Sequence, residues 1–531
     1  MIVVTGVRVG ISDGEQAAIE KATAELDIKR VAIKSSYIIK ASVDARRRTN
    51  MSMVYSVGFE LESQRTEAVL VKKLNKPNVS IRLKTESKLV HGTTPLCSRP
   101  VVAGFGPAGM FAALTLAQNG FCPIVLERGG DIDARVSAVE GFWKGGSLDT
   151  QTNVQFGEGG AGTFSDGKLT TRISDSHCDA VLREFVRFGA PKEILYKAKP
   201  HIGTDKLRDI VKAMRKEIIH LGGEIRFLTQ LNNFSLTSAG LEGVTANDDE
   251  FAAQVLVLAV GHSARDTFAL LQKKEVALEV KPFSVGVRIE HLQKDVDKGL
   301  FGEFSGNNAL GKGEYQLSHR RGERAVYTFC MCPGGVVVPA ASEDGGVVVN
   351  GMSEYARAGV NANSALVVSV DKNDFGTDPM EAIAFQRKLE QAAFAAGGSD
   401  YKAPAQTVGD FLKGRTGLNL GTVQPSYANG VKAANMLDIF PQQIIDMMRL
   451  GLVVFGGKLK CFTAFDAVLT GVETRTSSPI RILRDETGEA HGTQGLYPCG
   501  EGAGYAGGII SSAVDGIKTA ESIIAKYKPE W

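Results

Sequence analysis

Residues 101–128 read VVAGFGPAGMFAALTLAQNGFCPIVLER, and this stretch decides the fold of the chain. Its apolar start predicts a strand over Pro100–Ala103, and the next apolar segment predicts a helix from about Ala108 to Asn119. Gly120 ends that helix, and Pro123–Leu126 is typical of a second strand. A glycine-rich turn between a strand and a helix indicates a dinucleotide-binding unit, because the helix N-terminus offers free N–H groups to phosphates.

The glycines of this turn have separate roles. We expect Gly104 to permit the tight turn, Gly106 to let the backbone approach a pyrophosphate, and Gly109 to let the helix pack close to the sheet. Glu127 ends the second strand, 23 residues after Gly104, where a carboxylate can accept hydrogen bonds from ribose hydroxyls. The expected nucleotide contacts of this stretch are Gly104, Gly106, Pro107, Ala108, Gly109, Glu127 and Arg128.

Length and composition are those of a globular protein with several domains. The chain has 531 residues, of which 43% are hydrophobic and 23% charged, and no apolar run approaches the length of a membrane span. Its seven cysteines are scattered and odd in number, which favours a reducing compartment over a disulfide framework. The N-terminal sequence lacks the basic and apolar regions of a signal peptide, so we expect a cytoplasmic protein without a membrane partner.

The sequence before the glycine-rich turn predicts a small first domain over residues 1–95. Strands are expected at Ile2–Val9, Val31–Ala41, Met53–Leu61 and Val79–Leu83, and helices at Asp13–Leu26 and Arg65–Leu74. The resulting order, βαββαβ, is that of a ferredoxin-like module. Thr85–Arg99 is expected to be the linker to the next domain.

The rest of the chain predicts an α/β fold with a Rossmann-type nucleotide-binding domain that is interrupted by an insertion. Its first part covers residues 96–275 and contains the apolar run Ala253–Val260, which is typical of a buried parallel strand. Residues 276–455 carry β segments and helices and are expected to form an inserted β-rich α+β domain for substrate or a cap. The α/β pattern returns in residues 456–531, the C-terminal part of the nucleotide-binding domain.

Three separated segments together resemble a known family. They are the glycine-rich turn with Glu127 and Arg128, the strand end LAVGH at residues 258–262, and YPCGE at 497–501 with GGI at 507–509. This combination resembles the FAD-binding flavoproteins of the glutathione reductase-like superfamily. The resemblance implies FAD as the cofactor and a helix whose N-terminus at Gly508 points at the flavin ring. The further expected cofactor contacts are Gly159, Gly160, Gly162, Thr163, Gly261, Gly500, Glu501, Gly508 and Ile509.

Four more segments narrow this resemblance. GEGGAGTFSDGKL from Gly157, HIGTDKL from His201, TFCMCPGG from Thr328 and GVETRTSSPIRI from Gly471 are similar to segments of uncharacterised bacterial FAD-dependent dehydrogenases. The resemblance implies an FAD-dependent dehydrogenase but no particular substrate. We expect an oxidoreductase that transfers hydride between the flavin and a small anionic metabolite. Because only one complete dinucleotide turn is present, NAD(P)H is expected at most as a transient reductant.

Four side chains are candidates for substrate chemistry. Arg475 stands among hydroxyl residues and could anchor a carboxylate or phosphate, or pair with Glu473. Lys168 follows the glycine-dense loop and could neutralise pyrophosphate or flavin charge, or be a solvated lysine. His262 and His201 are candidate acid–base groups or structural histidines. The close pair CMC at 330–332 lacks the CxxxxC spacing of disulfide reductases, so the role of Cys330 and Cys332 stays open, and no pattern predicts a metal site.

Two alternatives concern the first domain. Residues 1–95 hold 16 Lys and Arg against 10 Asp and Glu, a local charge of +6, in a chain whose total is 61 minus 59, or +2. The triple arginine at 46–48, with Lys40 and Arg30 nearby, motivates an RNA-modifying flavoprotein, although a charge of this size is modest and nucleic acid is not favoured. The other alternative is a domain that docks a protein partner or a second subunit, with FAD largely structural.

Overall fold

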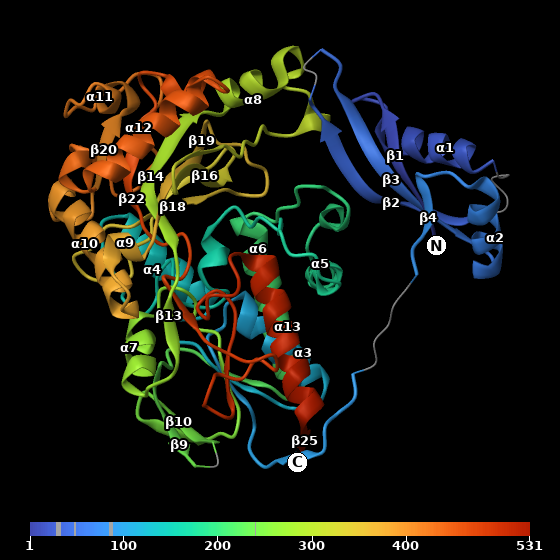
Figure 1. Cartoon of the computed structure of the whole chain (residues 1–531), viewed down its shortest axis with the longest axis horizontal. Helices are drawn as coiled ribbons and strands as arrows, with labels where there is room; N and C mark the ends of the chain where they lie inside the picture. The colour runs from blue at the N-terminus through green and yellow to red at the C-terminus, as the bar shows by residue number, and fades with distance from the viewer. Residues whose placement is uncertain (28–32, 47–48, 84–88, 239) are drawn as a thin grey trace.

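The computed structural model describes residues 1–27, 33–46, 49–83, 89–238 and 240–531. Figure 1 shows three units: a small N-terminal sheet with two helices, a parallel sheet with its helices, and a mixed sheet with further helices. Two helices far apart in the sequence, α3 (Pro107–Gln118) and α13 (Ile509–Lys526), lie side by side on the parallel sheet.

The N-terminal unit is an antiparallel sheet in the order β2-β3-β1-β4. Its elements are β1 (Ile2–Val9), α1 (Gly14–Leu26), β2 (Ile33–Asp44), β3 (Ser52–Leu61), α2 (Gln64–Leu74) and β4 (Val79–Ile81). This is the element order that the sequence pattern predicts; the part of the predicted strand Val31–Ala41 before Ile33 lies outside the described residues. One face of the sheet is apolar and is covered by α1: Val4 and Val57 share a buried core with Ala18 of that helix.

The second unit, the nucleotide domain, contains a five-stranded parallel sheet in the order β24-β12-β6-β7-β8. Its strands are β6 (Val101–Ala103), β7 (Ile124–Leu126), β8 (Glu224–Arg226), β12 (Leu256–Leu258) and β24 (Leu496–Pro498). Its helices, besides α3 and α13, are α4 (Ile132–Trp143), α5 (His177–Arg187), α6 (Thr204–His220) and α7 (Arg265–Lys273). β6, β7, β12 and β24 are largely apolar because both faces of the sheet are covered, whereas the edge strand β8 carries two charged residues.

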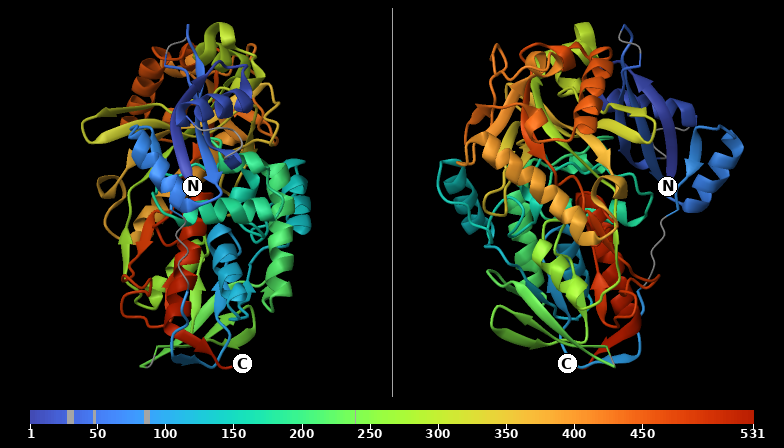
Figure 2. Two further views of the ribbon diagram at one scale, coloured as in Figure 1. Left: turned by 90° about the vertical axis from the view of Figure 1, so that its right-hand side faces the viewer. Right: turned by 60° about the vertical axis from the view of Figure 1, so that its left-hand side comes forward.

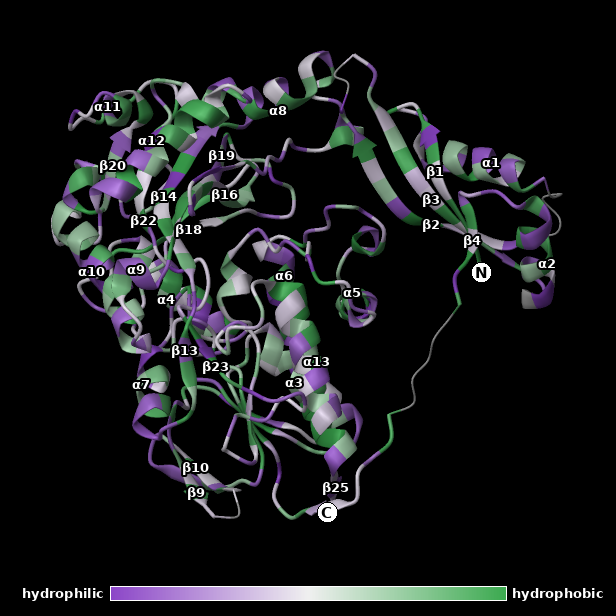
Figure 3. Ribbon diagram, in the orientation of Figure 1, coloured by the Kyte–Doolittle hydropathy of each residue, from purple (hydrophilic) through white to green (hydrophobic). Residues whose placement is uncertain are grey.

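Helices α3 and α13 approach each other closely. A Cβ atom added to Gly516 of α13 would lie 2.2 Å from the carbonyl oxygen of Ala108. Ala113 of α3 and Ala513 of α13 are fully buried in the same core. Helix α13 carries both hydrophobic and hydrophilic residues along its length (Figure 3), and its apolar side forms this contact.

The other face of the parallel sheet packs on an antiparallel meander. The meander consists of β9 (Leu231–Thr237), β10 (Gly240–Ala246) and β11 (Asp249–Ala252). Phe234 and Val244 of the meander share a core with Val101 and Leu256 of the parallel sheet.

The third unit, the inserted domain, is built on a seven-stranded sheet in the order β15-β16-β19-β14-β22-β20-β21. The strands are β14 (Phe283–Leu292), β15 (Ser318–Arg321), β16 (Arg324–Cys332), β19 (Asn361–Val370), β20 (Ala403–Thr407), β21 (Val431–Ala433) and β22 (Val468–Glu473), with a separate hairpin of β17 (Val336–Pro339) and β18 (Val349–Met352). The helices are α8 (Gln293–Phe301), α9 (Lys372–Phe375), α10 (Pro379–Gly397), α11 (Val408–Leu412) and α12 (Gln442–Gly456).

The chain enters and leaves the inserted domain through two paired strands. β13 (Leu278–Val280) precedes the domain, β23 (Ile480–Ile482) follows it, and the two pair antiparallel. The domain end predicted at residue 455 is therefore wrong, because β22 pairs with both β14 and β20. An isolated apolar segment gives no local sign of the sheet that it joins.

The boundary predicted at residue 95 is also wrong. It divides β5 (Thr94–Leu96), which pairs in parallel with β25 (Tyr527–Pro529) at the other end of the chain. β5 therefore continues the nucleotide domain, and the expected linker Thr85–Arg99 contains a strand. Residues 85–88 of that linker lie outside the described residues.

The N-terminal unit contacts both other units. The Ala41 amide donates to the Tyr196 carbonyl at 2.7 Å, and the Ala198 amide donates to the Ala41 carbonyl at 2.9 Å. Ile11 in turn packs in a small core with Phe301 of α8. Figure 2 shows the N-terminal unit, in dark blue, beside the rest of the molecule.

The close contact of α3 and α13 gives a test of the fold. We expect Gly516→Ala to lower the free energy of unfolding by about 1–3 kcal/mol, because the added Cβ overpacks the contact with Ala108. Gly141→Ala is the matched control: Gly141 lies in α4, a Cβ there would meet no described atom within 4 Å, and alanine should stabilise the helix by about 0.5–1 kcal/mol. Urea unfolding followed by circular dichroism measures both, and a Gly516→Ala midpoint equal to that of the parent would contradict the contact.

Candidate cofactor site

Two glycines of the turn after β6 are required by the protein itself. Gly104 has φ +98°, and a Cβ there would lie 2.4 Å from the Ala259 carbonyl oxygen. A Cβ on Gly109 would lie 1.9 Å from the Gly104 carbonyl oxygen. These positions therefore need glycine whether or not a ligand binds.

Two other glycines have no such requirement. Gly106 has φ −78°, and a Cβ there would meet a single described atom within 4 Å, the Gly160 Cα at an ordinary 3.6 Å. A Cβ on Gly507 would meet no described atom within 4 Å. Since neither packing nor backbone conformation demands glycine here, the open space in front of these residues fits the close approach of a ligand to the backbone.

The structure brings three of the predicted cofactor segments together. A Cβ on Gly160 would lie 2.9 Å from the Gly106 Cα, and one on Gly162 would lie 3.1 Å from Ile509. A Cβ on Gly500 would lie 2.5 Å from the Ala108 Cβ. The glycine-rich turn, the loop Gly157–Thr163 and the segment Gly500–Ile509 thus meet at the carboxyl ends of parallel strands, where ligands of such sheets bind.

Two helices begin at this place. Pro107 is the first residue of α3 and Gly106 its N-cap, while Gly508, with φ +150°, is the N-cap of α13. Both N-caps are glycines and have no side chain that could satisfy the first amides, so both helix ends present free N–H groups to an anion. Gly261, which follows β12 with φ +74°, lies against Gly502 in the same region.

Glu127 holds the backbone around the turn. One carboxylate oxygen accepts from the Phe105 amide at 2.8 Å, and the other accepts from the Gly129 and Gly157 amides at 3.0 and 2.9 Å. The expected ribose contact stays a prediction: the oxygen that accepts from Phe105 has one further lone pair, whereas the other oxygen already accepts two hydrogen bonds. The carboxylate has a structural role as well, which its position at the end of a strand did not indicate.

Arg128 and Thr163 lie at the edge of this region. Arg128 donates to Asp266 at 2.9 Å and stacks over the Phe156 ring, with 4.3 Å from its guanidinium carbon to the ring centroid. Thr163 is fully buried, and its hydroxyl has no hydrogen-bond partner among the described residues. An unsatisfied buried hydroxyl in the glycine-dense loop is a group that a ligand can satisfy.

Glu501 lies half-buried in the same region, and its carboxylate accepts no hydrogen bond from a described residue. Burial raises its pKa to about 7, and the charge of Lys281 only partly opposes this effect. A carboxyl without a protein donor fits the hydroxyl groups of a cofactor's ribityl chain. Lys281, which the sequence analysis did not single out, is the cation that faces it.

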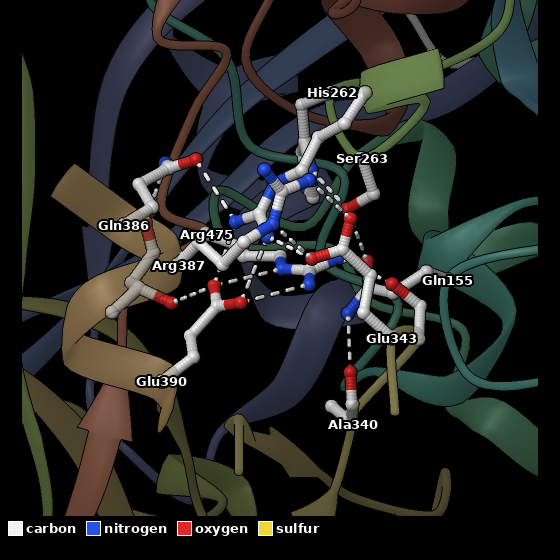
Figure 4. Close-up of polar contacts among 12 residues, drawn as sticks. Gln155, His262, Ser263, Ala340, Glu343, Gln386, Arg387, Glu390 and Arg475 are labelled. Carbon is white, nitrogen blue, oxygen red and sulfur yellow. Dashed lines mark hydrogen bonds and ion pairs between the residues drawn. The ribbon is translucent and has the colours of Figure 1, made fainter. Parts of the chain in front are cut away.

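Arg475 is part of a buried charge network rather than a free anion site (Figure 4). Its guanidinium donates to the Glu390 carboxylate at 3.1 and 3.2 Å and to the Ser342 hydroxyl. Arg265 donates to the same carboxylate at 2.8 and 2.9 Å. The alternative pairing of Arg475 with Glu473 is wrong, because Glu473 pairs with Arg288 at 2.6 Å.

The sequence contains a signal for this network that the analysis did not use. Gln386 and Glu390 are four residues apart on the buried face of α10, among apolar residues. Buried polar residues on an apolar helix face need partners from elsewhere in the fold. Glu343 extends the network, since it accepts from both Arg265 and the more exposed Arg387 (Figure 4).

His262 lies beside this network and is neutral. Its Nδ1 is 2.9 Å from the Ser263 hydroxyl. Burial, together with the charges of Arg475 and Arg265, lowers its pKa to about 3. A neutral imidazole of such low pKa does not accept a proton readily at neutral pH, so the structure favours its structural role over the acid–base one.

Lys168 and His201 lie together. Their backbones form an antiparallel bridge. The His201 Nε2 donates to the Tyr355 carbonyl at 3.0 Å, and its ring stacks on that of Tyr355. Burial and the nearby charge of Arg357 lower the pKa of His201. Lys168 thus neighbours His201, and Arg475 lies near His262.

The basic residues of the first domain are only partly described. Arg46 donates to the Asp44 carboxylate at 2.6 and 2.8 Å, an exposed local pair. Arg30, Arg47 and Arg48 lie outside the described residues. Within the described part of the chain, no helix is long and apolar enough to cross a membrane, and no cluster of His, Cys, Asp or Glu could hold a metal.

Comparison with known proteins supports an FAD-dependent class for part of the chain. Residues 282–476 match the family described as FAD-dependent protein, C-terminal domain-like. The match agrees with the FAD-dependent class that the sequence predicts, while membership of the glutathione reductase-like superfamily stays a prediction. The matched residues include the whole seven-stranded sheet, from β14 to β22.

A full-length relative gives the family. The chain is 45% identical over 528 residues to an uncharacterized protein of Clostridium beijerinckii, and the match covers 99% of this chain and 98% of the relative. The chain belongs to the family of that protein.

Solved structures show a more distant similarity. Glycine oxidase from Bacillus cereus is 11% identical, with 82% of this chain and 99% of that chain covered and a TM-score of 0.34. L-amino acid deaminase from Proteus vulgaris is 10% identical, with 85% and 98% covered and a TM-score of 0.37.

The two classes of glycine predict two different mutant phenotypes. We expect Gly106→Ala to leave the free energy of unfolding of the flavin-free protein within about 1 kcal/mol of the parent and to weaken FAD retention at least about tenfold, because the Cβ occupies the ligand's side. Gly109→Ala should instead destabilise the flavin-free protein, since its Cβ meets the Gly104 carbonyl. Unfolding curves and the visible absorption of dialysed protein measure the two properties, and full flavin content in Gly106→Ala would contradict the site.

Glu501 predicts a pH dependence of stability. Its pKa of about 7 in the folded protein lies above the value near 4.3 of an unfolded chain. The folded state therefore binds this proton more tightly, and the resulting stabilisation is present below about pH 4 and lost as pH rises through 7. We expect the difference in free energy of unfolding between flavin-free Glu501→Gln and the parent to shift in favour of the variant from pH 5 to pH 8. Urea unfolding at the two pH values measures this difference. An equal difference between the two proteins at both pH values would contradict the raised pKa.

Proposed function

We propose that this protein binds FAD where the glycine-rich turn, the loop Gly157–Thr163 and the segment Gly500–Ile509 meet, and that it is an oxidoreductase for a small molecule. The observation that carries the proposal is the open space in front of Gly106 and Gly507, between the N-termini of α3 and α13. The family match to an FAD-dependent protein supports the same cofactor.

Each part of this region suits one part of FAD. The free amides at the start of α3 suit the pyrophosphate, and Glu127 reaches the ribose side. Glu501 suits the ribityl hydroxyls, and the start of α13 suits the polar edge of the flavin ring. Bound FAD would supply hydride-transfer chemistry, and the chain's residues would bind and orient the reacting partners.

The substrate that we propose is small and anionic, and NAD(P)H is proposed as a transient reductant. In the described residues a single dinucleotide turn is formed, the one after β6, and the proposal assigns it to FAD. A pyridine nucleotide would then have no turn of its own and would bind transiently against the flavin ring. The Arg475 guanidinium is already held by Glu390 and Ser342, so it is a poor anion anchor.

The test is a reduction experiment on the purified, flavin-loaded protein. The released cofactor is identified as FAD by its chromatographic retention and mass, and the protein is then titrated anaerobically with NADPH and NADH. We expect loss of the visible flavin band with one of the two nucleotides. If neither bleaches the band, a library of small organic anions is titrated in the same way, and a flavin that none of these reduces would contradict the proposed redox function.

A further inference from the structure

Arg135 of α4 is fully buried, and no carboxylate of the described residues forms an ion pair with it. The charges of Glu127 and Glu158 act on its guanidinium only at longer range. Instead, the guanidinium donates five hydrogen bonds, and every acceptor is a backbone carbonyl of the segment 153–160. Because a buried charge is costly unless it is fully hydrogen-bonded, Arg135 and this segment form one structural unit.

The five bonds use all three nitrogens of the Arg135 guanidinium. Nε donates to the Asn153 carbonyl and Nη2 to the Val154 carbonyl, each at 2.9 Å. Nη1 donates to the carbonyls of Gly157, Glu158 and Gly160 at 3.3, 2.6 and 2.9 Å. A guanidinium has five N–H donors in a fixed planar fork, which the compact ammonium of lysine cannot reproduce. The fork therefore sets the direction of these carbonyls.

The loop backbone also packs directly on the Arg135 side chain. Gly157 has φ +117°, and a Cβ there would lie 2.5 Å from the Arg135 Cδ, so this glycine makes room for the arginine. Its amide donates to Glu127 at 2.9 Å, while its carbonyl accepts from Arg135. The ring of the fully buried Phe164 lies 4.8 Å from the guanidinium carbon. The start of the loop is thus held from both sides.

The other side of the loop lies against the glycine-rich turn after β6. The Gly159 amide donates to the Phe105 carbonyl at 2.9 Å. A Cβ on Gly160 would lie 2.9 Å from the Gly106 Cα. Arg135 therefore holds the loop from behind, and the held loop reaches the glycine whose open side faces the proposed cofactor.

The peptide bond between Gly160 and Ala161 is the last one that Arg135 holds. Its carbonyl accepts from Arg135 at 2.9 Å and from the Thr163 amide at 3.2 Å. In a trans peptide the N–H points opposite to the C=O, so the Ala161 amide points away from the guanidinium. Among the described residues this amide has no acceptor. A donor without a partner in this position suits a ligand anion.

We propose that Arg135 is a positioning residue for FAD. It turns the carbonyls of the segment 153–160 inward and thereby directs the Ala161 amide at the cofactor's pyrophosphate, across from the free amides at the start of α3. Arg135 acts through the loop and is not itself a cofactor contact. The inference rests on the proposed function, because it concerns the same cofactor site.

The first test compares FAD affinity in two arginine variants. Flavin-free full-length protein is titrated with FAD, with flavin fluorescence as the signal and circular dichroism as the check of folding. We expect Arg135→Lys to weaken FAD binding about tenfold or more, because lysine keeps the charge but not the fork.

Arg288→Lys is the matched control. Arg288 is also fully buried and holds a backbone carbonyl, that of Cys330 at 2.8 Å, but its hydrogen bonds reach no cofactor segment. Its FAD affinity should stay within about twofold of the parent value. Urea unfolding of both variants measures the loss of stability separately from the loss of affinity.

The second test removes the Ala161 amide and leaves Arg135 in place. Ala161 is the first residue of a short helical turn, where proline is tolerated. We expect Ala161→Pro to weaken FAD binding about tenfold or more, since the lost N–H is a donor to a charged group. Ala161→Ser keeps the amide and should bind FAD within about twofold of the parent.

The outcomes separate this inference from the proposed function. Parent-like FAD affinity in Arg135→Lys or in Ala161→Pro would overturn the role of Arg135, and so would an equal loss of affinity in Arg288→Lys. If Arg135→Lys does not fold, Ala161→Pro decides alone. A parent protein that binds no FAD would instead contradict the proposed function.

Discussion

A single buried carboxylate, Glu390, holds the nucleotide domain against the inserted domain. It accepts hydrogen bonds from Arg265 on α7 and from Arg475 after β22, so it joins both domains at the place where the chain returns from the insertion. Burial alone would raise its pKa, but the two guanidinium charges lower the pKa well below the ordinary value. Loss of one member of such a network leaves an uncompensated charge in the interior and typically costs about 3–5 kcal/mol. The network is therefore better understood as a means of fixing one arrangement of the domains than as a source of net stability.

A second interdomain pair fixes the site itself. Arg357 of the inserted domain holds Asp166 of the glycine-dense loop, and the same loop reaches Gly106 through Gly160. The position of the inserted domain thus sets the position of the loop that lies against the helix ends of the nucleotide domain. In the site that we propose, such polar ties hold the loop in place and would reduce the ordering cost of binding. The arrangement also explains why the insertion is anchored by polar groups on two sides rather than by apolar packing alone.

The sequence predicted what is locally encoded. The strand, turn and helix from Val101 to Gln118 have apolar patterns and glycines within a few residues of one another, and the N-terminal element order follows from alternation alone. Partners distant in sequence could not be found this way. Arg475 forms an ion pair with Glu390, and β22 pairs with β14, which lies far earlier in the chain. The carbonyl of Cys330 in β16 is held by Arg288 of β14, and no spacing rule connects the two residues. The segments that meet at the carboxyl ends of the strands were therefore predictable from the sequence, but the partners of the charged side chains were not.

Glycine was the most informative residue, but for two different reasons that only the structure separates. Gly104 and Gly109 touch other parts of the backbone, and any protein with this turn needs them for folding. A side chain at Gly106 or Gly507 would meet almost no other atom, so the protein gains no packing from its absence. Glycine also gives the unfolded chain more conformational entropy, which lowers the stability of the folded state. An open side alone does not mark a binding site, because Gly141, exposed on α4, has one as well. Gly106 and Gly507 differ from Gly141 in their place: they lie at the starts of α3 and α13, where free amides suit the pyrophosphate-bearing cofactor that we propose.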